Sequence, residues 1–467
     1  MDIVIILLIM LLVFSTVTIL LLKKFDGYGR KLPIMVEQNE LIKTVMIISG
    51  LILVLYFVFE NYFTNGAAFD ELFYKLEQDF GLDFHVFFSE SVLNKDCYIN
   101  NNEGFNPPLI KIISLFIYRS FPEKYQQMYL QSAISNTEMD IRLLVQAQLT
   151  FILFVGSSLV ILVLMVYHFK KGGATEKLGS VFLALTNIGV LFAIERGNYV
   201  ILAFPLTLFF VLTYESDNKY MRELGLLSLA MASGLKVYPC LLGLILLKDK
   251  RWKDALRTVF YGILFIFGPF TFYGGIAGIK GFFSSLIAGG GTKALRLGTL
   301  NMTSIFCTVL RMCNISQESI VSILAELKII SYVIFVVAIF FIFIYKERWK
   351  SISMIVVLIL LYSGTSHTYM LSFLYLPIFL FLEDKRYQSC VKYIYMLLFI
   401  LLTNIIVLPV GRYIQMFRDE GDRITSLMFL QQLCLMILLS LLLSEGVLIC
   451  FSKIKKKMYK KKDTKAL

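Results

Sequence analysis

Residues 143–168 read LLVQAQLTFILFVGSSLVILVLMVYH, and this stretch decides the fold because it contains no Asp, Glu, Lys or Arg. About 20 consecutive apolar residues let an α-helix cross the hydrocarbon core of a bilayer, which is roughly 30 Å thick. Backbone groups find no water inside that core, so they must bond to one another within a helix. Lys170 and Lys171 follow almost at once, and basic residues mark the cytoplasmic end of a span. The stretch therefore predicts a transmembrane helix whose carboxyl end faces the cytoplasm.

Similar apolar runs recur along the chain of 467 residues, which is 58% hydrophobic and 17% charged. Soluble domains are about half apolar and about one quarter charged. The predicted spans are Asp2–Leu22, Leu41–Phe59, Leu143–His168, Glu176–Ile194, Tyr199–Tyr214, Tyr220–Lys236, Val237–Leu247, Ala255–Tyr273, Leu327–Tyr345, Ser351–Ser363, Thr368–Leu382, Val391–Val410 and Thr425–Cys450. Val237–Leu247 is too short for a straight span, so Tyr220–Leu247 is either two spans or one broken element. We expect an all-α polytopic membrane protein, a helical bundle of about 13 transmembrane spans.

The net charge of +12, from 45 basic and 33 acidic residues, would suggest a nucleic-acid partner in a soluble protein. Here the basic residues gather in short loops and in the tail, a pattern that predicts cytoplasmic loops and attraction to anionic membrane lipids instead. The basic patches are 23–31, 170–171, 219–222, 248–253, 346–350, 385–386 and 453–465. The predicted spans place all of them on one side, so we expect an outside N-terminus and a cytoplasmic C-terminus. The predicted location is a bacterial plasma membrane.

The predicted topology leaves two long segments, 60–142 and 274–326, on the outer face. Both contain amphipathic stretches, so we expect interfacial helices in them. Pro108–Phe121 is the clearest, with Lys111 and Arg119 predicted to snorkel toward the lipid headgroups. The chain then divides into three parts. These are 1–40 with an extra first span and an inner basic loop, 41–410 as the main membrane domain, and 411–467 with the last span and the Lys-rich tail.

The first candidate for chemistry is Asp83, which lies beside Phe84, Phe87 and Phe88. A carboxylate among aromatic side chains is partly desolvated, which favours a role as a base or as the partner of a cation. The structural alternative is an N-cap on a helix over residues 84–93.

Two further polar groups interrupt apolar sequence on the predicted outer face. Glu195–Asn198 places Arg196 and Asn198 between two spans, and Lys236 is followed closely by Tyr238. Polar residues at membrane depth are costly and are functional candidates by default, and a lysine there either binds an anion or snorkels. The alternatives are a simple solvated turn at Arg196 and snorkelling by Lys236.

Asn301 opens an apolar stretch in the second outer segment, and His367 lies on the predicted outer face, so both are added as candidate ligands. No Cys, His or acidic cluster has the spacing of a metal site, so no metal is expected. The seven cysteines are interpreted as small buried or idle thiols. The alternative is a disulfide from Cys97 to Cys307 or to Cys313.

The order of these motifs resembles glycosyltransferase family 87, a group of polyprenol-phosphate-dependent enzymes of the GT-C superfamily. The residues that carry the resemblance are Asp83-Phe84, Tyr98, Phe105–Leu109, Arg196–Asn198, Lys236–Pro239, Arg251-Trp252, Asn301–Thr303, Ser366-His367 and Leu376-Pro377. It runs from about Leu41 to Leu382. The chain departs from the pattern in its extra first span and in a long lead-in before Asp83. That lead-in leaves Asp70, Asp79 and Asp96 as rivals of Asp83.

The resemblance implies a GT-C-like helical bundle with its active site on the outer face. The implied enzyme is a mannosyltransferase-like transferase of the cell envelope. It moves a hexose from a polyprenyl phosphate to a lipid- or glycan-linked acceptor, with inversion and without a cofactor. Asp83 would then be the general base. The donor and its phosphate would be held by Lys236, Arg196, Asn198, Tyr238, His367 and Asn301. The alternative function is a flippase or transporter of lipid-linked sugars, or a polysaccharide polymerase.

The topology gives a first testable prediction. Reporter fusions should place residues 248–253 in the cytoplasm and Asn101 outside, because basic loops stay inside. Fusions that report both positions on one side would contradict the topology and the location of the site together.

Overall fold

The structure is a computed structural model that describes residues 38–59, 80–85, 97–100, 106–128, 142, 144–292, 299–313, 315–364, 366–384, 390–405, 413–414 and 424–463. The first predicted span, Asp2–Leu22, lies outside the described residues. The described part is helical apart from one short antiparallel pairing, in which Tyr413 and Ile414 of β1 lie opposite Thr425 and Ile424 of β2.

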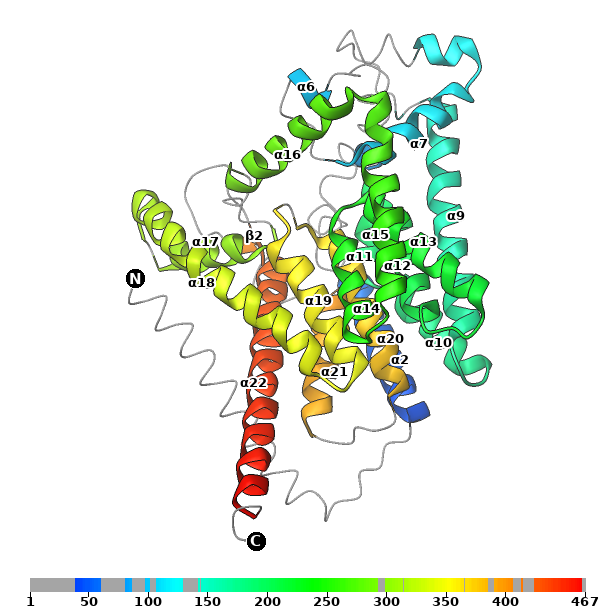
Figure 1. Cartoon of the computed structure of the whole chain (residues 1–467). Coiled ribbons are helices and arrows are strands. Elements are labelled where there is room, and N and C mark those ends of the chain that lie inside the picture. The colour runs from blue at the N-terminus through cyan, green and yellow to red at the C-terminus, as the bar shows by residue number, and fades with distance from the viewer. Residues whose placement is uncertain are drawn as a thin grey trace.

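The helices form one elongated bundle (Figure 1). In chain order they are α2 (Gln38–Phe59), α6 (Cys97–Asn100), α7 (Pro108–Arg119), α9 (Val145–Phe169), α10 (Ala174–Leu185), α11 (Ile188–Arg196), α12 (Val200–Thr213), α13 (Lys219–Leu235), the 3₁₀ segment η3 (Tyr238–Gly243), α14 (Leu244–Lys248), α15 (Trp252–Phe267), η4 (Gly268–Phe272), α16 (Gly275–Thr292), α17 (Met302–Met312), α18 (Gln317–Ile344), α19 (Arg348–Tyr362), η6 (Thr368–Leu374), α20 (Tyr375–Glu383), α21 (Cys390–Thr403) and α22 (Ser426–Asp463). Helices α6, α7 and α16 lie at one end of the bundle, and the C-terminal end of α22 lies at the other (Figure 1).

Four helices of the described part are long and apolar enough to cross a membrane: Val145–Phe169, Trp252–Phe272, Glu318–Ile344 and Leu427–Lys455. A fifth span results if α10 and α11, which meet at a bend of 52°, are counted as one. The predicted number of about 13 spans is not confirmed. Several apolar segments are short helices packed inside the bundle, and in α19 every residue from Trp349 to Leu361 is buried. A helix surrounded by protein is as apolar as one surrounded by lipid, so composition does not separate them.

Two helices extend past their predicted ends. Helix α18 begins at Gln317 rather than at Leu327, with the Ser316 hydroxyl accepting a hydrogen bond from the Ser319 amide. Its first turns carry Glu318, Glu326 and Lys328. These charges lower the mean hydropathy of the start of the helix, so hydropathy alone predicts a loop there. Helix α22 continues beyond the predicted end at Cys450 into the Lys-rich tail, because lysine is a good helix former.

The interruption predicted within Tyr220–Leu247 is present in the structure. Helix α13 ends at Leu235, the backbone of Lys236 is extended with φ −142° and ψ 125°, and η3 begins at Tyr238 with Pro239 in its first turn. Proline lacks the amide hydrogen that would continue a helix, so the chain restarts as a new element.

The helix predicted over Pro108–Phe121 is present as α7, but the snorkelling predicted for Lys111 was wrong. Lys111 is 1% exposed, and its ammonium lies over the Tyr98 ring, 5.0 Å from the ring centroid. Arg119 at the end of the helix is exposed, as expected. Helix α7 packs against α13 and η4, so the face that carries Lys111 is covered by protein instead of lipid headgroups.

The backbone of α11, the second helix of the bent pair α10 and α11, lies very close to the backbone of η6. A Cβ added to Gly189 of α11 would lie 2.1 Å from the backbone nitrogen of Ser372 in η6. Only a glycine allows this separation, and the contact fixes the helix that ends in Arg196 relative to the segment that follows His367.

We therefore expect Gly189→Ala to destabilise the protein by about 1–3 kcal/mol, because overpacking forces the two backbones apart. Gly156→Ala in α9 is the matched control, since its Cβ would meet nothing within 4 Å and alanine is the better helix former. Thermal unfolding in detergent should show a lower Tm for the first variant only. Equal Tm values for the two variants would contradict the close contact.

Candidate functional site

Asp83 lies in a short helical turn at residues 82–85, next to the end of α11. The Gly81 amide donates a hydrogen bond to the Glu195 carbonyl at 2.7 Å, which fixes this turn on the bundle. Because Asp83 itself is helical, it is not the N-cap of a helix beginning at residue 84, and that alternative was wrong. Phe87 and Phe88 lie outside the described residues.

Both carboxylate oxygens of Asp83 are bound by the turn that follows α11. The Arg196 guanidinium donates to Oδ1 at 2.5 Å, and the Asn198 side-chain amide donates to Oδ2 at 2.7 Å. The Arg196 and Asp83 side chains are 17% and 18% exposed, so the ion pair is partly withdrawn from water. Arg196 and Asn198 are therefore parts of a polar site and not of a simple solvated turn.

Gly197 makes this turn possible. Its φ is +62°, the left-handed conformation that commonly ends a helix. A Cβ at this position would lie 2.6 Å from the Phe151 ring and 2.7 Å from Phe84. The Asn198 side-chain oxygen Oδ1 accepts from the Val200 amide at 3.1 Å, which orients the Asn198 side-chain nitrogen toward Asp83.

An aromatic cluster supports the short turn that carries Asp83. The Phe84 ring stacks on Tyr199 at 6.2 Å and meets Phe151 edge-on at 5.8 Å between centroids. The Tyr199 hydroxyl is in turn 2.6 Å from the Ser114 hydroxyl of α7. The turn that carries Asp83 is thus held to the bundle by the aromatic packing of Phe84, and Tyr199 is in turn bonded to α7.

Lys236 lies at the break after α13 and turns into the protein. Its side chain is buried, with the residue 8% exposed, and its ammonium donates to the Asn106 side-chain oxygen at 3.1 Å. Asp83 acts electrostatically on this ammonium. The snorkelling alternative for Lys236 was therefore wrong. Asn106 was not among the predicted site residues, although it lies within the Phe105–Leu109 segment that the resemblance had marked.

A second group of candidates gathers around η6. The Tyr238 ring meets Phe373 edge-on at 5.5 Å between centroids. Its buried hydroxyl has no hydrogen-bond partner among the described residues. His367 precedes η6, with its ring 5.6 Å from that of Tyr369. Phe373 belongs to η6 and His367 directly precedes it, so these aromatic residues share one region.

Asn301 joins the same region as a structural anchor. Its side-chain oxygen caps α17 by accepting from the Ser304 amide at 2.7 Å, and its amide donates to Thr299 at 2.8 Å and to the Gly364 carbonyl at 3.4 Å. The Leu300 amide donates to the Ser366 carbonyl at 2.7 Å. Asn301 thus holds the segment before His367 in place, while its role as a direct ligand stays a prediction.

The predicted site residues therefore form two adjacent groups. Asp83, Arg196, Asn198 and Lys236 make a charged group, and Tyr238, His367 and Asn301 make an aromatic and amide group. Lys236 and Tyr238 are two residues apart, and the Gly189 contact ties α11 to η6. Together they offer a carboxylate, two cations and aromatic surfaces, a combination suited to a hydroxylated substrate that carries an anion.

Several predictions fall on residues that the structure does not describe. Asp70, Asp79 and Asp96, the rivals of Asp83, lie outside the described residues, as does the Cys97 side chain. Cys313 is an exposed free cysteine, so the pairing of Cys97 with Cys313 was wrong. Within the described part of the chain, no three His, Cys, Asp or Glu side chains are grouped as metal ligands.

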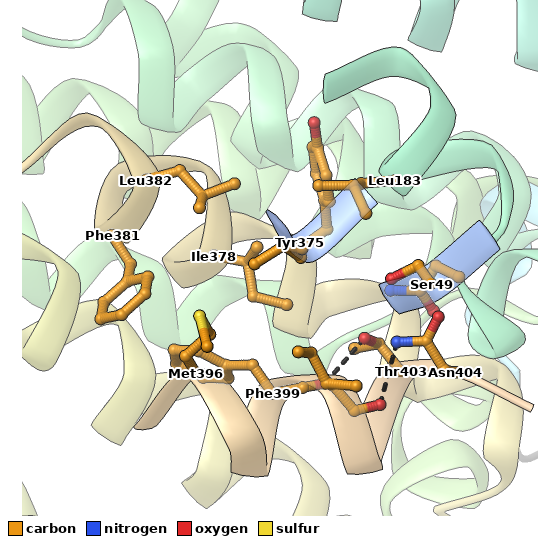
Figure 2. Close-up of a pocket in the computed structure, with 13 residues that line it drawn as sticks. Ser49, Leu183, Tyr375, Ile378, Phe381, Leu382, Met396, Phe399, Thr403 and Asn404 are labelled. Atoms are coloured by element: carbon orange, nitrogen blue, oxygen red, sulfur yellow. Dashed lines mark hydrogen bonds between the residues drawn. The ribbon is translucent and has the colours of Figure 1, made fainter. Parts of the chain in front are cut away.

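A small cavity lies away from these groups, between α2, α10, α20 and α21 (Figure 2). Its volume is about 30 Å³, and Ser49, Tyr375 and Asn404 are among the residues that line it. Ligand pockets usually measure about 300–1,000 Å³, so this cavity is too small for a sugar.

Fold and site together define a helical membrane protein with a buried charged site at the breaks of its helices. Residues 141–365 match the model of glycosyltransferase family 87, which supports that family and glycosyltransferase activity for this chain. The match includes Arg196, Asn198, Lys236, Tyr238 and Asn301 and is shorter than Leu41–Leu382, the stretch whose motifs resemble that family. No curated protein and no solved structure matches the chain.

The matched segment ends before two of the candidates. Asp83 precedes it, and His367 follows its last residue. The structure connects both of them to matched residues, since Asp83 is bound by Arg196 and Asn198 and the segment before His367 is bound by Leu300 and Asn301.

Proposed function

We propose that this protein is a membrane glycosyltransferase with a polyprenyl-phosphate sugar as donor. It transfers a hexose such as mannose to a lipid- or glycan-linked acceptor at the outer face of a bacterial plasma membrane, with inversion. The observation that carries the proposal is the charged group in which Asp83 is held by Arg196 and Asn198 beside Lys236. The family match supports the reaction class.

Asp83 is the general base. An ionised carboxylate has about four lone-pair sites, and Arg196 and Asn198 each take one, so positions stay open for an acceptor hydroxyl. When that hydroxyl attacks the anomeric carbon, its proton passes to Asp83. A new carbon–oxygen bond forms as the bond to the donor phosphate breaks, and the electron pair leaves with the lipid phosphate. A single displacement of this kind inverts the anomeric centre and needs no covalent intermediate.

Lys236 and Arg196 hold the donor phosphate in the proposed reaction. The leaving phosphate gains negative charge as the bond breaks, and fixed cations in a water-poor site stabilise such charge more strongly than water does. Arg196 also orients Asp83, whereas Lys236 is positioned by the neutral Asn106. Loss of Lys236 should therefore remove only a contact to the phosphate, whereas loss of Arg196 should also leave Asp83 without its ion-pair partner.

Lys236→Gln should raise the KM for the donor about tenfold with a smaller change in kcat, because a charge-assisted contact to the bound phosphate is lost. Arg196→Gln should lower kcat as well, since Asp83 loses its partner. Steady-state kinetics with a polyprenyl-phosphate sugar separate the two effects. Arg119→Gln on the exposed end of α7 is the control, and unchanged donor dependence in both site variants would exclude them as phosphate ligands.

Asp83→Asn should fold, bind donor lipid and turn over at least about a hundredfold more slowly, because general-base catalysis typically contributes 10²–10⁴. Asparagine keeps the shape of the side chain and can still contact Asn198. Product formation by the purified variant is the measurement, with the exposed Asp217→Asn as control.

A fully active Asp83→Asn variant would move the base to Asp79, Asp96 or Asp70. If the wild-type protein forms no glycosylated product but moves the lipid-linked sugar across vesicle membranes, the flippase alternative would replace the transferase.

A further inference from the structure

Tyr98 lies in the short helix α6, at the end of the bundle where α7 and α16 also lie (Figure 1). Its side chain is buried, with the residue 1% exposed. The rings of Phe270, Tyr273 and Phe282 meet it edge-on, with centroids 5.2, 6.1 and 6.0 Å from its own. These four residues, here called the Tyr98 cluster, form one buried core. They join α6 to η4, to the residue after η4 and to α16.

The Tyr98 ring is also held by contacts outside the cluster. A Cβ added to Gly281 of α16 would lie 1.6 Å from the Tyr98 carbonyl oxygen, so the backbones of α6 and α16 nearly touch. The Lys111 ammonium of α7 lies over the ring, 5.0 Å from its centroid, and a cation is attracted to the face of an aromatic ring. The packing therefore fixes the position of the Tyr98 hydroxyl oxygen.

That hydroxyl donates a hydrogen bond to the Asn106 carbonyl. Asn106 is followed by Pro107 and Pro108, and a residue before proline has a restricted backbone conformation. Pro108 is the first residue of α7, which packs against α13 and η4. The Tyr98 hydroxyl and the start of α7 thus hold the backbone of Asn106 from two directions along the chain.

The side chain of Asn106 carries this order on to the charged group, because its oxygen accepts from the Lys236 ammonium at 3.1 Å. Two hydrogen bonds therefore lead from the Tyr98 hydroxyl to Lys236. A packing contact reaches the same place, since Val237, the next residue, packs against the Tyr98 cluster. The lysine ammonium is a point charge on a flexible four-carbon stem, so its position depends on such partners.

From these contacts we infer that Tyr98 is a positioning residue for the donor phosphate, which it serves by holding Lys236 in place through Asn106. The inference rests on the proposed function. Because Asn106 is uncharged, it orients the ammonium without neutralising it. Because Tyr98 holds Asn106, less side-chain freedom is lost when an anion binds to Lys236, and preorganisation of this kind strengthens binding.

Binding of farnesyl phosphate, a short donor analogue, to the full-length protein in detergent tests the inference by native mass spectrometry. Tyr98→Phe keeps the ring and removes only the hydroxyl, so it should weaken binding about fivefold. Lys236→Gln should weaken binding about tenfold. The two changes combined should bind no more weakly than Lys236→Gln alone, because Tyr98 acts through Lys236. Independent effects would multiply instead, to about fiftyfold.

Tyr118→Phe is the matched control. The Tyr118 hydroxyl of α7 donates to the Gln126 carbonyl at 3.0 Å, so this variant also loses a hydrogen bond from a tyrosine to a backbone carbonyl. Both tyrosine variants should show similar Tm values, but only Tyr98→Phe should bind farnesyl phosphate more weakly. Asn106→Asp keeps the shape of the side chain and places a carboxylate beside Lys236. It should weaken binding about tenfold, because the ammonium is then neutralised.

Turnover with a polyprenyl-phosphate sugar gives a second readout. Tyr98→Phe should raise the KM for the donor and leave kcat unchanged, because the ion pair of Asp83 and Arg196 stays intact. Unchanged farnesyl phosphate binding by Tyr98→Phe would overturn the inference, and so would effects that multiply in the combined variant. In either case the wild-type protein still binds the probe and the proposed function stands. A wild-type protein that does not bind farnesyl phosphate would overturn the proposed function and this inference together.

Discussion

The ion pair between Asp83 and Arg196 connects two parts of the chain that are 113 residues apart. It fixes the turn at residues 82–85 on the end of α11, and the relative positions of the charged side chains of the site depend on it. Both side chains are largely shielded from water, where a charge that loses its partner is costly. Asn198 completes the arrangement by binding the second carboxylate oxygen. The Asp83 carboxylate and the Arg196 guanidinium are therefore positioned by one another.

The second organising constraint is that hydrocarbon does not tolerate unsatisfied backbone groups, so helices break only where protein surrounds the break. The chain breaks at Asn187 between α10 and α11, at Lys236 after α13, and at His367 before η6. At the first break, the Asn187 side-chain oxygen caps α11 by accepting a hydrogen bond from the Gly189 amide at 2.8 Å. The other two breaks present polar side chains to the site. The interruptions of the helices thus bend the bundle and also place polar side chains in the site.

Segments 60–142 and 274–326 contribute unequally to this arrangement. The first brings Asp83 and Asn106 to the charged group, whereas the second brings Asn301, whose amide holds the chain before His367.

The sequence by itself determined the helical membrane character, the break near Lys236 and the identity of most candidate residues, because hydrophobic runs and isolated charges are local properties. It did not determine the number of spans, because α19 and other buried helices are as apolar as lipid-facing ones. Only the tertiary structure decided that Lys111 and Lys236 point into protein, that Asn106 belongs to the site and that Arg196 binds Asp83. The reason is physical, since a charged side chain near a membrane boundary can reach either water or a buried partner. Which of these it reaches depends on what other segments of the folded chain place beside it.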